Sequence, residues 1–129
     1  MLKIVLPSEV KDCWGNIRPE LLKMGETDGW IPEDVYAFLI GGHATLYVND
    51  GAWQGFVILQ LLPNYSEKRL HIWIAAGWGD MLSYRDEVVE IAKQSGAKRI
   101  TFESPRRAWE KAGPKYGFEP KRTIYEMVL

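Results

Sequence analysis

The sequence predicts a mixed α/β, or α+β, fold: a mostly antiparallel sheet with one β-α-β crossover and flanking helices. Short apolar runs separated by turn residues fill the middle of the chain, which is typical of consecutive antiparallel strands. After residue 80 the apolar residues recur at steps of three and four, which indicates an amphipathic helix. Another apolar run follows this helix and completes the crossover.

The length and composition predict a single domain over residues 1–129. A chain of 14.8 kDa with 47% hydrophobic residues can bury one core. Its longest apolar runs, 56–62 and 70–78, are far shorter than the roughly 20 residues of a membrane span. The apolar stretch before Pro7 is too short for a signal peptide. We therefore expect a cytoplasmic protein with no membrane partner.

The N-terminal part predicts one strand and two short helices. Leu2 to Leu6 is a β-type run. A helix through Val10 to Trp14 follows, and Gly15 is expected to end it. Pro19 suits the first position of a second helix, Glu20 to Met24.

A third helix is predicted after the loop Glu26 to Trp30. Pro32 suits its first position, and acidic residues follow in the first turn, where the helix dipole favours them. Its inward stripe is Val35, Phe38 and Leu39, and a pair of glycines at 41 and 42 ends it.

Three strands joined by tight turns form the predicted meander. They cover Ala44 to Val48, Trp53 to Leu62 and Arg69 to Ala75. The residues Asn49 to Gly51 are of the types that favour a tight turn, and Pro63 to Ser66 makes the second turn.

The last third predicts helix, strand, helix and strand. Asp80 caps the amphipathic helix, and Gly96 supplies a left-handed stop. The remaining elements are a strand at Arg99 to Glu103, a short helix at Arg106 to Ala112 and a closing strand at Thr123 to Leu129.

Charge is distributed unevenly along the chain although the net charge is −1. Residues 1–92 carry seven basic and 13 acidic side chains, whereas residues 93–129 carry nine basic and four acidic ones. A basic C-terminal part favours an anionic ligand or a protein partner. The overall balance is not that of a nucleic-acid-binding protein. One cysteine (Cys13) and two histidines (His43 and His71) provide no recognisable metal site and no internal disulfide.

The order of elements resembles the fold of the GCN5-related N-acetyltransferases (GNAT). The resemblance is carried by the segments 70–81, 86–105 and 106–129, with Gly117-Phe118 before the final strand. It implies an acyl-CoA-dependent N-acyltransferase that uses acetyl-CoA or another acyl-CoA. The substrate would be an amine of a small molecule or a protein. The family's first helices and their loop, here Trp14 to Trp30, form the acceptor wall.

In this family a splayed strand binds the pantetheine arm, and a glycine loop at a helix N-terminus binds the pyrophosphate. The resemblance places the splayed strand at Leu70 to Ala75. It implies the following cofactor-binding residues: Ile72, Trp73, Ile74, Ala76, Gly77, Trp78, Gly79, Asp80 and Met81. The loop departs from the family because Ile74 replaces the usual Gln or Arg. The carboxylate of Asp80 also competes with a phosphate for the helix N–H groups.

The catalytic residues implied by the resemblance are two candidate bases and one candidate acid. His71 on the splayed strand and Glu103 on the next strand have the required chemistry for accepting a proton from the amine. Tyr116, next to Gly117, is the candidate acid for the leaving thiolate. The usual Asn and Tyr positions of the family are occupied here by Pro105 and by Ala112 or Gly113.

These departures leave a second interpretation open. The sequence also resembles acetyltransferase-like proteins of tailed bacteriophages, some of which are virion or assembly components. The chain would then be a catalytically inactive GNAT-fold structural or interaction protein, located in a virion if phage-encoded. Fold alone does not decide between the two interpretations.

Overall fold

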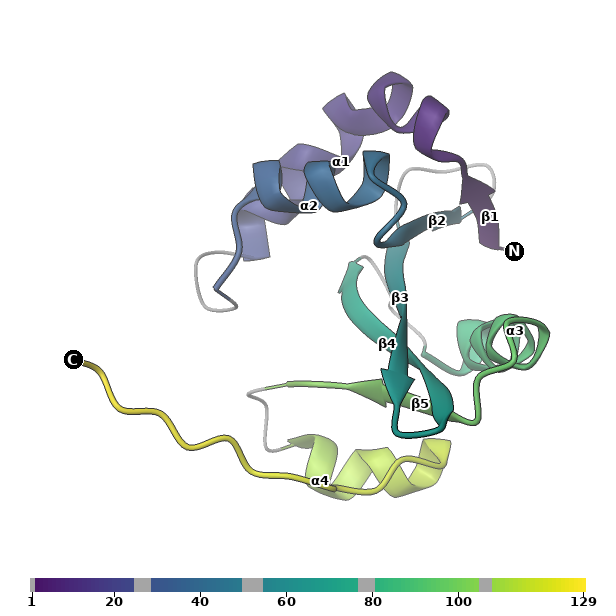
Figure 1. Cartoon of the computed structure of the whole chain (residues 1–129), viewed down its shortest axis with the longest axis vertical. Coiled ribbons are helices and arrows are strands. Elements are labelled where there is room, and N and C mark those ends of the chain that lie inside the picture. Colours follow the sequence, from purple (N-terminus) through teal and green to yellow (C-terminus); the bar gives the residue numbers. More distant parts are fainter. Residues whose placement is uncertain (1, 25–28, 50–54, 77–80, 105–107) are drawn as a thin grey trace.

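The computed structural model describes residues 2–24, 29–49, 55–76, 81–104 and 108–129. A five-stranded sheet with the order β1-β2-β3-β4-β5 forms its centre (Figure 1). The strands are β1 (Leu2–Val5), β2 (Thr45–Asn49), β3 (Phe56–Asn64), β4 (Glu67–Ala76) and β5 (Arg99–Phe102). The first three ladders are antiparallel and the ladder between β4 and β5 is parallel. The predicted fold class is therefore confirmed.

Helices lie against both faces of this sheet. They are η1 (Pro7–Glu9), α1 (Val10–Met24), α2 (Pro32–Ile40), α3 (Met81–Gln94), α4 (Ala108–Ala112) and η3 (Gly113–Tyr116). None of the helices in these described parts of the chain is long and apolar enough to cross a bilayer.

Each face of the sheet has its own hydrophobic core. On one face, α1 and α2 pack over Leu46, Ile58 and Ile74. On the other face, Val88 and Ala92 of α3 pack over residues that include Val57, Leu59, Leu70 and Ile72. The alternation of β2 and β3 side chains sends successive residues to opposite cores.

The N-terminal helices are one element, so the predicted break at Gly15 is wrong. α1 runs from Val10 to Met24 and includes Pro19. Proline lacks the N–H that would bond the carbonyl of Gly15, which costs one hydrogen bond. Four side chains at steps of three and four remain buried along the whole helix: Val10, Cys13, Ile17 and Leu21. Packing of this continuous stripe outweighs the local signals for a break.

The hairpin between β3 and β4 is tighter than predicted. Its ladder continues through Pro63 and Asn64, which pair with Lys68 and Glu67. The turn is reduced to Tyr65 and Ser66, and Tyr65 adopts a left-handed φ of 58°. Asn49 is the only described residue of the predicted turn Asn49 to Gly51. Residues Glu26 to Asp28 of the predicted loop also lie outside the described residues.

The predicted closing strand does not form a ladder, and this prediction is wrong for the single chain. Thr123 to Leu129 pairs with no strand among the described residues. In Figure 1 the segment extends away from the sheet toward the C-terminus. Its side chains are exposed. Among the described residues, the preceding helix begins at Ala108. Arg106 and Arg107, with which it was predicted to begin, are not among the described residues.

Candidate active site

The two parallel strands separate at a defined point. Their ladder starts at Arg69↔Arg99 and ends at Ile72↔Phe102. β4 then continues through Ala76. Beyond Ile72, the β4 backbone on this side is not paired with β5 and can offer N–H and C=O groups to a ligand. Of the predicted splayed strand Leu70 to Ala75, Leu70 to Ile72 are paired with β5, and Trp73 to Ala75 are not.

A β-bulge lies at the same point of β4. The register with β3 changes from Leu59↔Ile72 to Ile58↔Ile74, which leaves Trp73 as the extra residue. Ile72 thus belongs to the α3 core, whereas Ile74 belongs to the core under α1 and α2. A bulge bends its strand and increases the local twist. It accounts for the divergence of β4 from β5 directly afterwards.

Three side chains from both strands meet next to this split. Nδ1 of His71 lies 2.9 Å from Oγ1 of Thr101, and the Arg69 guanidinium donates to the same oxygen at 2.8 Å. Nδ1 of His71 is also 3.5 Å from the Arg69 guanidinium. Because Leu70 and Ile72 face α3, the intervening His71 faces the opposite side of the sheet. The parallel register brings Thr101 directly beside it.

The surroundings of His71 favour its neutral form. Burial lowers its pKa from the ordinary value, the neighbouring Arg69 lowers it further, and Glu103 opposes both by raising it. Glu103 is exposed, just past the end of β5. The two predicted bases, His71 and Glu103, are thus close enough to interact electrostatically. Of the two, His71 is half-buried and Glu103 is exposed. A neutral imidazole near pH 7 can accept a proton.

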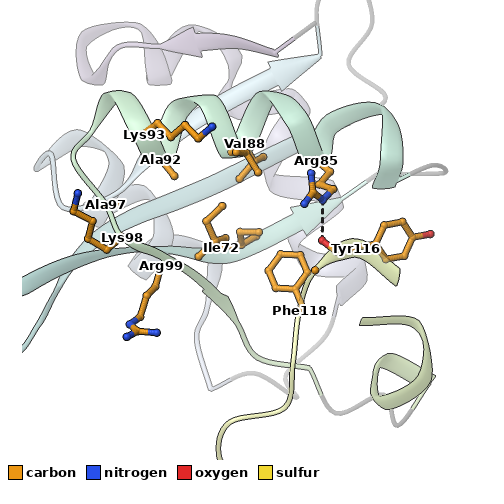
Figure 2. Close-up of a pocket in the computed structure, with 13 residues that line it drawn as sticks. Ile72, Arg85, Val88, Ala92, Lys93, Ala97, Lys98, Arg99, Tyr116 and Phe118 are labelled. Atoms are coloured by element: carbon orange, nitrogen blue, oxygen red, sulfur yellow. Dashed lines mark hydrogen bonds between the residues drawn. The ribbon is translucent and has the colours of Figure 1, made fainter. Parts of the chain in front are cut away.

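Tyr116, the predicted acid, lies on the other side of the sheet. The Nε of Arg85 in α3 donates to its backbone carbonyl at 2.8 Å. Its ring points away from Ile72 and Phe118 (Figure 2). The structure therefore places Tyr116 on the α3 face and His71 on the face of α1 and α2, so they could reach a ligand in the split only from opposite sides.

The predicted cofactor-binding residues fall into two groups. Ile72, Trp73, Ile74 and Ala76 lie on β4 at and beyond the end of the ladder. Ile72 and Ile74 are buried, so their main chains are the parts available to a ligand. Gly77, Trp78, Gly79 and Asp80 lie outside the described residues. Met81 is the first residue of α3.

A groove of about 270 Å³ lies on the α3 face (Figure 2). Apolar side chains form its floor, among them Ile72, Val88, Ile100 and Phe118. The basic residues Arg85, Lys93, Lys98 and Arg99 also line it. The ring of Phe118 packs on Phe102 at a centroid distance of 5.0 Å and an angle of 78°. The groove is therefore bounded by α3, β5 and the segment that follows α4.

An aromatic surface borders the split on the side of α2. Phe38 was predicted to point into the core, but it is 41% exposed. The centroid of its ring lies 5.2 Å from that of Trp73 and 5.9 Å from that of His43. Helical periodicity identifies a stripe, yet it cannot tell which member lies at the edge of the covered area. Phe38 is therefore a candidate for the acceptor side of the site.

Sequence reasoning also missed Arg69 and Thr101. Alternation along β4 puts Arg69 on the same face as His71, and this signal was available in the sequence. The contribution of Thr101 depends on the parallel register of β4 and β5. Register between strands joined by a long crossover is a tertiary property that one sequence does not reveal.

The fold can be compared with solved structures. The sequence itself matches no protein-family model and no curated protein. A probable acetyltransferase is similar with 12% identity and a TM-score of 0.71, over 100% of this chain and 97% of that one. Aminoglycoside N-acetyltransferase AAC(6')-Iy in complex with CoA shows 17% identity and a TM-score of 0.69, over 99% and 93%.

An aminoglycoside acetyltransferase from an uncultured soil metagenomic sample, in complex with sisomicin, shows 10% identity and a TM-score of 0.66, over 100% and 94% of the two chains. At these identities the likeness establishes the fold. The chain has the fold of the GCN5-related N-acetyltransferases, as the sequence resemblance implied.

Proposed function

We propose that this protein is an acyl-CoA-dependent N-acyltransferase. The observation that carries the proposal is the separation of β4 and β5 directly after Ile72↔Phe102, beside the half-buried His71. The split offers a main-chain ligand surface, and the histidine offers a base at its edge. The fold shared with a CoA-bound acetyltransferase supports the acyl-CoA assignment.

The reaction is a direct transfer between two substrates. The amine nitrogen attacks the thioester carbonyl carbon, a C–N bond forms, and the C–S bond breaks. The nitrogen loses one proton to Nε2 of His71, directly or through one water molecule. The thiolate leaves with a proton from Tyr116, whose ring would have to turn toward the split from the α3 side. Main-chain N–H groups of Trp73 to Ala76 stabilise the negative charge on the carbonyl oxygen.

His71 needs one tautomer for this role. When Nδ1 carries the proton, it donates to Oγ1 of Thr101 and leaves the lone pair of Nε2 available. The Thr101 oxygen has two lone pairs, so it can accept from His71 and from Arg69 together. Thr101 is therefore a positioning residue, and Glu103 stabilises the imidazolium that forms.

The acyl-CoA would be held by β4 and by the basic C-terminal part. The β4 backbone at Trp73 to Ala76 would bind the pantetheine amides. Lys111 and Lys115, exposed on α4 and η3, would attract the phosphates. The phosphate-binding role of Gly77 to Met81 remains part of the proposal.

The acceptor would carry several amino groups, of which the attacking one is neutral and others are positively charged. Exposed carboxylates on the acceptor side include Glu33 and Asp34 at the start of α2 and Glu103 at the split. The aromatic pair Phe38 and Trp73 adds faces that attract a cation. The aminoglycoside substrates of the similar structures have this chemistry.

Binding of the acyl-CoA is the first test. Thermal unfolding with 1 mM acetyl-CoA should show a higher midpoint than without ligand. For a Kd near 10 μM the stabilisation is about 2.7 kcal/mol, which corresponds to a shift of several degrees. Free CoA is the parallel ligand, and ATP at the same concentration controls for unspecific anion binding. An unchanged midpoint with acetyl-CoA would contradict the proposal.

Turnover is the second test. Release of free thiol from acetyl-CoA is followed with a panel of aminoglycosides, polyamines and peptide N-termini. His71→Gln should lower kcat by about 100-fold at pH 7 while the acetyl-CoA shift persists. Tyr116→Phe should lower kcat without raising KM. Lys11→Gln, an exposed change on α1, is the control.

The second interpretation, a catalytically inactive structural or interaction protein, predicts neither binding of acetyl-CoA nor turnover. It rests on the sequence departures at Ile74, Asp80 and Pro105. The acetyltransferases with the same fold support the enzyme.

A further inference from the structure

The inner end of the split between β4 and β5 is filled by the two strands and by the α3 core. The ladder ends at Ile72↔Phe102, so main-chain pairing closes the space between the strands on the inner side of this pair. Toward α3, Ile72 is 7% exposed and belongs to the same core as Val88. Phe102 packs on Phe118 with a ring-centroid distance of 5.0 Å. A group bound at this end of the split therefore meets packed side chains on the α3 face.

The direction of a bound thioester brings its acyl group to this inner end. In the proposed function, on which this inference rests, the main chain of Trp73 to Ala76 binds the pantetheine arm and the carbonyl oxygen. The arm enters from the open end, where β4 and β5 run apart (Figure 1). The thioester carbon is trigonal, so the acyl group lies on the side away from the sulfur. It therefore points toward Ile72 and Phe102.

Trp73 stands at this point on the face of α1 and α2. It is the extra residue of the bulge and follows Ile72 directly. Ile74 belongs to the core under α1 and α2, and Trp73 packs against the same core. Two consecutive side chains thus turn to one face, which the bulge permits and a regular strand does not. The bulge therefore adds an indole beside the split, on the face that also carries His71.

Contacts with α2 hold this indole in place. The ring centroids of Trp73 and Phe38 lie 5.2 Å apart at an interplanar angle of 47°, a tilted arrangement that favours aromatic attraction. Trp73 is half-buried, so part of its ring is covered and part remains open. Turning the ring away would break its packing against Phe38 and the core. The indole is therefore a fixed wall beside the inner end of the split.

We propose that Trp73 restricts the acyl group of the donor to a short chain of the size of acetyl or propionyl. Its indole occupies the space on the face of α1 and α2 that a longer chain would need. Each methylene that enters free apolar space strengthens binding by about fourfold, and this gain is lost when the space is already filled. Trp73 is thus a specificity-determining residue of the proposed reaction.

An acyl-CoA series with the wild-type chain tests this restriction. Dissociation constants are measured by titration calorimetry for free CoA, acetyl-CoA, butyryl-CoA and hexanoyl-CoA. Acetyl-CoA should bind about as tightly as free CoA, whereas hexanoyl-CoA should bind at least about tenfold more weakly. Equal affinities for acetyl-CoA and hexanoyl-CoA would show that a longer chain leaves the split by another route, such as the groove on the α3 face. That result would overturn the inference.

Truncation of the indole should reverse the preference. Trp73→Ala should bind hexanoyl-CoA at least about tenfold more tightly than the wild type does, with a change for acetyl-CoA of less than about threefold. Trp73→Leu is the milder truncation and should show the same trend if the alanine variant does not fold. Tyr47→Ala removes another half-buried aromatic side chain, two strands away on β2, and should keep the wild-type preference. A wild-type preference in folded Trp73→Ala or Trp73→Leu would refute the role of Trp73.

Free CoA separates the failure of this inference from the failure of the proposed function. If neither free CoA nor any acyl-CoA binds, the proposed function is wrong and the inference falls with it. If free CoA and acetyl-CoA bind but the affinities do not depend on Trp73 and chain length as described, the proposed function stands and the inference is refuted.

Discussion

Ile72 of β4 and Phe102 of β5 are the last paired residues of the parallel ladder, and both are held in place by side-chain packing. Ile72 is 7% exposed in the α3 core, and Phe102 packs edge-on against Phe118. The bulge residue Trp73 follows immediately. The point at which the strands separate is therefore fixed by side-chain packing, and β4 continues beyond it without a ladder to β5.

Thr101 should control the activity of His71 without contacting substrate. Thr101→Val keeps the shape of the side chain but removes the oxygen that bonds Nδ1 of His71 and the Arg69 guanidinium. We expect kcat to fall by about tenfold, because the imidazole loses its fixed tautomer and orientation. The pH dependence of kcat should shift as well.

Thr101→Ser is the matched control for this change. Serine retains the hydroxyl and should retain most of the activity and the wild-type pH profile. Equal losses in the Val and Ser variants would mean that the methyl group matters, and the positioning role would be rejected.

The stability of the protein should fall as the pH decreases below about 6.5, and His71 should cause part of this fall. Burial and Arg69 lower the pKa of folded His71 below its ordinary value of 6.5. The unfolded chain then binds a proton more readily than the folded chain, so stability is present above pH 6.5 and is lost as the pH falls toward the folded pKa. Urea unfolding between pH 8 and pH 5 measures this slope.

His71→Gln should make that slope shallower. His43→Gln removes the other imidazole, an exposed one, and tests whether any histidine substitution has this effect. An unchanged slope in His71→Gln would show that the folded and unfolded forms titrate alike.

Two glycines should respond oppositely to the same substitution. Gly96 ends α3 with a φ of 78°, and Gly15 lies inside α1; a methyl group would meet no atom within 4 Å at either position. Gly96→Ala should cost about 1 kcal/mol because alanine is strained at positive φ. Gly15→Ala should stabilise the protein by about 0.5–1 kcal/mol through helix propensity. Chemical denaturation compares the two, and equal signs would contradict the geometry.

The thiol of Cys13 should react only when the protein unfolds. It is 5% exposed, its Sγ donates to the carbonyl of Val10 at 3.4 Å, and burial raises its pKa. A thiolate is the reactive form, so labelling by a disulfide reagent should be slow in buffer and fast in urea. Rapid labelling in buffer would indicate local opening of α1.

The sequence was sufficient for the fold class and for most of the elements, whereas the predicted break at Gly15 and the closing strand at Thr123 to Leu129 were wrong. Periodicity and turn residues predicted the meander, α3 and β5 because local and tertiary preferences agree there. Agreement failed in α1, where the local signals of Gly15 and Pro19 oppose the packing of the stripe from Val10 to Leu21.

The site could be predicted only in part. His71 was predicted as a base because of its residue type and its strand, and this role stays a prediction. Thr101 contacts it through a register that a crossover of more than 20 residues leaves open, whereas Arg69 lies two residues away on the same strand and was missed. The bulge at Trp73 was also not predicted, since one extra residue in a strand leaves the surrounding apolar run intact.

The closing segment shows a different kind of limit. Its composition is that of a strand, and the prediction of β structure followed from it. A strand, however, requires a neighbour, and composition does not state which chain supplies it. The structure of one copy leaves Thr123 to Leu129 without a ladder.

The neighbour relations in the sheet have a consequence for how the chain folds. The strands β2, β3 and β4 follow one another in the sequence and are neighbours in the sheet. This part of the sheet can therefore form from local hairpins. β5 joins last, through a parallel ladder of only four residue pairs and the packing of α3. We expect hydrogen exchange to be slowest in β3 and β4 and to show α3, β5 and α4 opening together as a less stable unit. The part of the chain that bears Thr101 would then be the first to detach.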